Sequence, residues 1–108
     1  IMIIEFDNEE LEDFILLGKA TSRPYLRWLS NRELRMGIED AVRILSVVDN
    51  CSQLMNYRRL AYEHLRYDRK GQSSIRLGYK TKFRLIFEEL ENGIKINVLE
   101  ISEHYGDK

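Results

Sequence analysis

The chain has 108 residues, of which 44% are hydrophobic and 32% charged, and its net charge is −1. This length suits one hydrophobic core, so we expect residues 1–108 to form a single domain, and the composition is that of a globular protein rather than a disordered one. Its apolar runs fall far short of the ~20 residues of a membrane helix, and the start of the sequence lacks a basic leader. The single cysteine, Cys51, fits a reducing compartment. We therefore predict a cytoplasmic protein without a membrane partner.

The beginning of the chain predicts a strand and then a helix. Residues 2–6 (MIIEF) combine β-branched and apolar residues, as short strands do. Asp7 is followed three residues later by Glu10, which is the spacing of a capping box. We therefore expect a helix to begin after Asp7 and to end at Gly18.

Two more helix starts follow. Residues 24–29 begin with proline, which is favoured at the first helical position, and Trp28 in this short helix is expected to be a core residue. Ser30 and Glu33 form a second capping box. Apolar residues then recur at helical spacing through residues 34–48, so this segment is predicted to be the longest amphipathic helix.

The second half of the chain has the pattern of strands separated by turns. Its Asn92-Gly93 pair is a strong hairpin signal. The strands are expected at residues 55–62, 73–77, 82–89 and 94–102. The predicted fold is therefore α+β, with an N-terminal strand and two to three helices packed on one face of an antiparallel β-meander.

The near-neutral net charge conceals a strongly basic segment. Residues 57–84 carry nine Lys and Arg side chains against Glu63 and Asp68, a net charge of +7, whereas the stretches before and after are each −4. Such segregation indicates a local face that binds a polyanion, although a solvated basic surface without a ligand would have the same pattern. An acidic segment of a protein partner could cover the same face.

A resemblance to a known family rests on two stretches, residues 65–77 (LRYDRKGQSSIRL) and 83–87 (FRLIF). From about Ala61 to Tyr105 the chain resembles the HigB type of the RelE/ParE toxin superfamily. The resemblance implies a RelE-like fold and the toxin component of a type II toxin-antitoxin system. It further implies an mRNA interferase that cleaves mRNA on the ribosome and inhibits translation, with a HigA-like helix-turn-helix antitoxin as its partner.

The resemblance also suggests site residues, with two departures from the family pattern. Arg66 aligns with a basic residue of the family and Arg84 with its strand arginine. The family's terminal acidic-Tyr-His tripeptide reads here with His104 before Tyr105. Its upstream histidine aligns with Glu63, and His64 lies one position away.

Metal-independent RNA cleavage needs a base for the 2′-hydroxyl, cations for the phosphate and an acid for the departing oxygen. Histidine suits proton transfer, arginine suits phosphate, and Glu63 or Glu103 could be the base if desolvated. The candidate catalytic residues are His104, Tyr105, Arg84, Arg66 and His64. The candidate RNA-binding residues are Arg69, Lys70, Arg76, Lys80 and Lys82. No metal-ligand spacing or phosphate-binding glycine loop occurs in the sequence, so we predict neither a metal nor a cofactor.

Two other functions are compatible with the sequence. A non-enzymatic poison of DNA gyrase is implied by resemblance to the ParE branch of the same superfamily. A folded RNA-binding module without catalysis is the other, and it predicts salt-sensitive RNA binding without cleavage.

Overall fold

The structure is a computed structural model and describes residues 1–103. Within these residues a strand is followed by helices and then by strands, as the sequence predicts. The α-helices and strands are β1 (Ile3–Phe6), α1 (Glu9–Leu17), α2 (Tyr25–Trp28), α3 (Arg32–Val47), β2 (Glu63–His64), β3 (Gln72–Arg76), β4 (Arg84–Leu90) and β5 (Lys95–Ser102). The 3₁₀ helices are η1 (Cys51–Asn56), η2 (Arg58–Leu60), η3 (Tyr67–Arg69) and η4 (Glu91–Gly93).

The strands of residues 1–103 form one mixed sheet of order β1-β5-β4-β3-β2. The pairs β2–β3, β3–β4 and β4–β5 are antiparallel, which confirms the predicted meander. The N-terminal strand adds a parallel edge, with Ile4 opposite Ile96 in β5, so the sheet as a whole is not antiparallel. The α+β fold class is confirmed.

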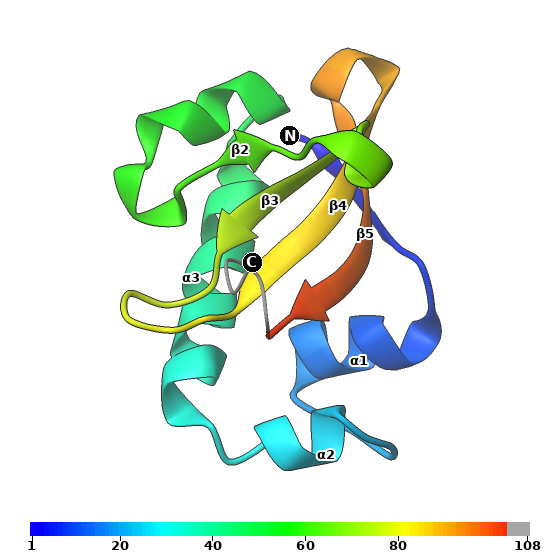
Figure 1. Cartoon of the computed structure of the whole chain (residues 1–108), viewed down its shortest axis with the longest axis vertical. Helices are drawn as coiled ribbons and strands as arrows, with labels where there is room; N and C mark the ends of the chain where they lie inside the picture. Colours follow the sequence, from blue (N-terminus) through cyan, green and yellow to red (C-terminus); the bar gives the residue numbers. More distant parts are fainter. Residues whose placement is uncertain (104–108) are drawn as a thin grey trace.

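The α-helices cover one face of this sheet. In Figure 1, α3 passes behind β3 and β4, and within residues 1–103 the face toward the viewer carries no α-helix. The core joins apolar side chains of α1, α2 and α3 to those of the strands, among them Leu11, Phe14, Trp28, Leu34, Ile38, Leu45, Ile75, Leu85, Phe87 and Val98. Trp28 is 5% exposed, so its predicted core position is confirmed, and Cys51 is also buried, at 1% exposed.

The helix caps differ from the prediction by one residue each. Asn8 rather than Asp7 begins α1, and its side chain accepts a hydrogen bond from the amide of Leu11 at 2.8 Å. Asn31 rather than Ser30 begins α3 and accepts from the amide of Leu34 at 3.0 Å. The side chain of an N-cap residue accepts a hydrogen bond from the backbone amide two or three residues onward. The position of the cap therefore depends on where the first turn of the helix is held. Here Leu11 and Leu34 are fully buried, and packing fixes those turns.

The strand expected at residues 55–62 is wrong, because the chain there forms η1 and η2. The Asn50 side chain accepts from the amide of Ser52 and starts the first of these 3₁₀ helices. Leu54 and Leu60 are buried, but Asn56 and Arg58 between them are exposed, so the segment lacks the alternate burial of a strand. The edge of the sheet is formed instead by the two residues of β2.

Candidate functional site

The sheet face that the α-helices of residues 1–103 leave uncovered carries a cluster of charged side chains at one end. The register places Glu63 opposite Ser74 and Arg76 opposite Arg84, and Ser102 of β5 lies on the other side of Arg84. Directly opposite residues on neighbouring strands point to the same face. We call Glu63, Ser74, Arg76 and Arg84 the arginine site. It lies at the carboxyl ends of β3 and β5, where β4 begins (Figure 1).

Arg84 is the centre of the arginine site and is only 7% exposed. Its Nε donates to Ser74 Oγ at 2.9 Å, and its Nη2 donates to the Ala61 carbonyl at 2.5 Å and to the Ser74 carbonyl at 3.4 Å. Ser74 is fully buried, and Ala61 adopts the left-handed conformation (φ 46°) at the end of η2. These acceptors fix the plane and direction of the guanidinium before any ligand arrives.

Charges in the arginine site act on Arg84 in opposite directions. Burial is the main influence and lowers the pKa of the Arg84 guanidinium, while the Glu63 carboxylate raises that pKa and the neighbouring Arg76 lowers it. A carboxylate and two guanidinium groups therefore share one end of the sheet face that no α-helix of residues 1–103 covers. A phosphate bound here would compensate the repulsion between the two arginines.

Arg69 lies across the same face, further along the strands. From η3 it donates to Gln72 Oε1 of β3 at 2.9 Å and to Glu100 Oε2 of β5 at 2.8 Å. It therefore bridges the two strands that flank β4, and an RNA phosphate would have to compete with Glu100 for it. The other predicted cations of this segment, Arg66 and Lys70, are exposed at the two ends of η3.

The loop between β3 and β4 carries two more of the predicted RNA-binding residues. Lys80 and Lys82 are exposed there, and the Lys80 ammonium lies 5.8 Å from the centre of the Tyr79 ring. This loop begins directly after Arg76, so its cations continue the positive charge of the arginine site beyond the end of the strand.

His64 lies on the opposite, helix-covered face of the sheet. Its Nδ1 is 3.1 Å from Ser73 Oγ and 3.7 Å from Glu89 Oε2. Glu89 also accepts hydrogen bonds from Ser73 at 2.6 Å and from the Tyr62 hydroxyl. The structure thus brings Arg84 and Arg76 together but separates His64 from them, because consecutive residues of β2 point to opposite faces.

The two remaining candidate catalytic residues, His104 and Tyr105, lie outside the described residues. Within the described part, the sequence did not indicate Ser74 or Ala61 as partners of Arg84. The available signal was the serine pair Ser73-Ser74 beside Ile75 in a predicted strand, since hydroxyl groups that are buried need hydrogen-bond partners.

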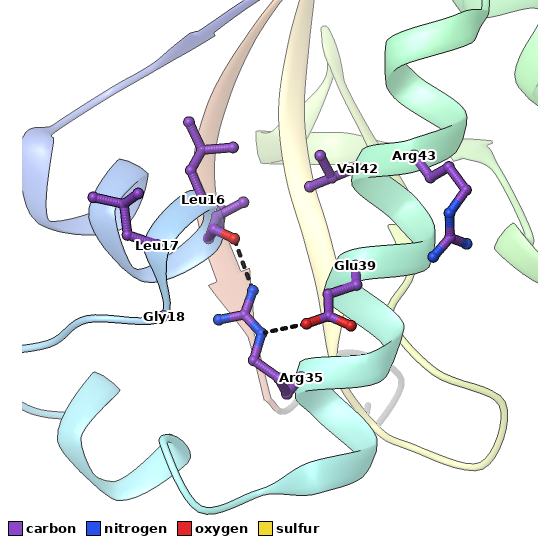
Figure 2. Close-up of a pocket in the computed structure, with 8 residues that line it drawn as sticks. Leu16, Leu17, Gly18, Arg35, Glu39, Val42 and Arg43 are labelled. Carbon is purple, nitrogen blue, oxygen red and sulfur yellow. Dashed lines mark hydrogen bonds and ion pairs between the residues drawn. The ribbon is translucent and has the colours of Figure 1, made fainter.

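A pocket of about 360 Å³ lies between the end of α1 and α3, away from the arginine site. Figure 2 shows the Arg35 guanidinium directed from α3 toward the end of α1 and toward Glu39. Arg35 donates to the carbonyls of Phe14 at 2.8 Å and Ile15 at 2.7 Å. These carbonyls belong to the last turns of α1, so Arg35 fastens α1 to α3. None of the predicted site residues lines this pocket.

Two features are absent from residues 1–103. Those residues contain no cluster of three or more His, Cys, Asp or Glu side chains arranged to hold a metal ion. They also contain no helix with both the length and the hydropathy to span a membrane.

The arrangement of the strands and helices is that of the YoeB/RelE-like toxin fold, as predicted. A YoeB/ParE toxin from Agrobacterium tumefaciens superposes with a TM-score of 0.59 over 96% of this chain and 100% of that chain, at 16% sequence identity. The YoeB dimer from Staphylococcus aureus superposes with a TM-score of 0.51 over 96% of this chain and 98% of that chain, also at 16% identity. No protein-family model and no curated protein matches the sequence.

Proposed function

We propose that this chain is the toxin of a type II toxin-antitoxin pair and cleaves mRNA on the ribosome. The observation that carries this proposal is the buried Arg84, oriented by Ser74 and Ala61 beside Arg76 and Glu63 on the open face of the sheet. The similarity to YoeB and ParE toxin structures supports it at the level of the fold. The HigB-like sequence pattern supports the choice of ribosome-bound mRNA as substrate.

The proposed reaction is attack of a 2′-hydroxyl oxygen on the adjacent phosphorus. Glu63 is exposed in the free protein, and bound RNA is proposed to cover and desolvate its carboxylate. The carboxylate then takes the 2′-hydroxyl proton, a new O–P bond forms, and the bond to the 5′-oxygen breaks. The products are a 2′,3′-cyclic phosphate and a 5′-hydroxyl end. Arg84 and Arg76 bind the phosphate oxygens as negative charge grows on them.

The acid that protonates the departing 5′-oxygen is assigned to His104 or Tyr105. Both residues follow Ser102 in the sequence, and Ser102 lies opposite Arg84. His64 is left out of the proposed site because it lies on the other face beside Ser73 and Glu89. Arg66, Lys70, Lys80 and Lys82 are proposed to bind RNA phosphates outside the reacting bond, and Arg69 does so if it is released from Glu100.

The proposed protein partner is a HigA-like antitoxin of helix-turn-helix type. Its binding to the basic segment of residues 57–84 would occlude the arginine site, and charge complementarity favours an acidic antitoxin segment there. A toxin that acts on translating ribosomes works in the cytoplasm, which is the location we propose.

The test is a translation reaction with purified protein, programmed ribosomes and labelled mRNA, run beside the same mRNA without ribosomes. The wild-type protein is expected to cut only the ribosome-bound mRNA and to leave cyclic phosphate ends. Glu63→Gln removes the proposed base and should slow cleavage by about 10²- to 10⁴-fold. The matched control is Glu12→Gln, which changes an exposed carboxylate of α1 and should cleave at the wild-type rate.

Intact mRNA in both wild-type reactions would contradict the nuclease proposal. Expression in growing cells then separates the two alternatives. A DNA-damage response with intact mRNA would identify a gyrase poison. Salt-sensitive RNA binding without either effect would identify a non-catalytic RNA-binding module.

A further inference from the structure

A pocket of about 300 Å³ adjoins the arginine site at the end of β3. It lies between α3, η2 and the loop that joins β3 to β4. Its apolar wall is formed by Met36, Leu60 and Tyr79. Its charged rim holds Glu33, Asp40, Arg59 and Arg76, and Arg59 is paired with Asp40. Arg76 belongs both to this rim and to the arginine site, so the pocket opens directly beside the proposed site of cleavage.

Two side chains of the wall expose an unusual amount of apolar surface. Tyr79 is 74% exposed and Met36 is 58% exposed. An aromatic ring of this kind offers a face on which a planar group can stack, and a thioether is a favourable contact for the edge of an aromatic system. Because Arg59 is paired with Asp40, Arg76 is the rim arginine that can bind a phosphate, and the exposed apolar wall beside it suits the base of the same nucleotide.

The pocket is formed by segments that are firmly held together. Gly37 of α3 contacts the backbone of Leu77 and Gly78 so closely that a Cβ at Gly37 would lie 2.3 Å from the Gly78 nitrogen. On the other side, Arg59 of η2 binds both carboxylate oxygens of Asp40, at 2.7 and 3.1 Å. The pocket therefore exists before a ligand binds, and little ordering opposes binding.

We propose that this pocket binds one unstacked nucleobase of a single-stranded RNA, whose phosphate lies against Arg76. The base stacks on Tyr79 with Met36 at its edge, next to the nucleotide held by Arg84. Stacking on an aromatic side chain accepts any base, so the pocket adds affinity and position along the strand. This inference rests on the proposed function, since it assumes that RNA crosses the arginine site.

The experiment measures binding of short single-stranded RNAs that carry the fluorescent base 2-aminopurine at each position in turn. For the wild-type protein we expect quenching at one position, and an abasic nucleotide there should weaken binding. Tyr79→Leu should abolish the quenching and weaken binding by about tenfold, whereas Tyr79→Phe should keep both properties. The abasic RNA should bind wild type and Tyr79→Leu equally, because the stacking partner is then already lost.

Tyr67→Leu is the matched control, because Tyr67 is 91% exposed on η3 and does not line the pocket. It should leave the position-specific quenching unchanged. Equal quenching by wild type and Tyr79→Leu, or an equal effect of the abasic nucleotide on both, would overturn the inference. Weaker antitoxin binding by Tyr79→Leu with unchanged RNA binding would also overturn it and assign the pocket to a protein contact.

The outcome for the pocket is separable from that of the proposed function. Loss of cleavage in Glu63→Gln together with unchanged RNA binding in Tyr79→Leu would retain the nuclease and reject the base pocket. A wild-type protein that neither binds these RNAs nor cleaves ribosome-bound mRNA would reject both.

Discussion

Gly37→Ala is the substitution for which the structure gives the clearest magnitude. Gly37 lies in the first half of α3, where helix propensity alone would make alanine more stable by about 1 kcal/mol. The added Cβ, however, would meet backbone atoms of Gly78 and Leu77 at 2.3 and 2.5 Å. Ordinary contacts begin near 3.4 Å, so the loop after β3 has to move by about 1 Å.

Overpacking of this kind costs about 3 kcal/mol at the upper end of its usual range, because the contacting atoms are backbone and cannot rotate away. After the gain in helix propensity, we expect a net loss of about 2 kcal/mol in the free energy of unfolding. For a chain of this size that corresponds to a Tm lower by about 8 °C. The same movement would displace Tyr79, so binding of RNA in the adjacent pocket should also weaken.

The assay is urea unfolding followed by the fluorescence of Trp28, the single tryptophan, which is 5% exposed in the core. Met36→Ala is the control, because this neighbouring side chain of α3 is 58% exposed and its loss should change stability by less than about 0.5 kcal/mol. A Gly37→Ala protein as stable as wild type, or more stable, would refute the close contact between α3 and the β3–β4 loop.

Three further predictions concern single side chains. Ser74→Ala removes the acceptor of Arg84 Nε, so it should lower the free energy of unfolding by about 1–3 kcal/mol and slow cleavage; unchanged values in both assays would contradict the positioning role. Burial raises the pKa of the Cys51 thiol to about 12, so a thiol reagent at pH 8 should react only after urea unfolding. The hydrogen bond from Arg59 lowers the pKa of Asp40, which stabilises the fold above the unfolded pKa and is lost as the pH falls below about 4; Asp40→Asn should therefore lose less stability over that range than wild type does.

Much of the fold could be predicted because local patterns and packing agree there. Alternation and the Asn-Gly turn located β3, β4 and β5 to within about two residues. The helical spacing of apolar residues in the segment of α3 predicted that helix equally well. The segment after residue 50 was predicted wrongly, because Leu54 and Leu60 are buried by tertiary contacts that no local period encodes.

The candidate site could be predicted only in part, because its geometry depends on pairing between distant strands. Arg84 was identified from its resemblance to a family arginine, and the basic segment from its charge. The partnership of Arg84 with Ser74 and Ala61 depends on the register of β3 with β4 and on the turn after η2. Whether Glu63 or His64 faces Arg84 depends on a two-residue strand, where a shift of one position exchanges the two faces.

The most direct test of the central claim compares one substitution on each face of the sheet. The measured quantity is the single-turnover rate of cleavage of labelled mRNA on programmed ribosomes, for Arg84→Lys and for His64→Gln. Lysine keeps the charge but loses the planar fork, so Arg84→Lys should cleave at least about 100-fold more slowly, while His64→Gln should stay within about threefold of wild type. An inactive His64→Gln beside an active Arg84→Lys would place the chemistry on the helix-covered face and contradict the account.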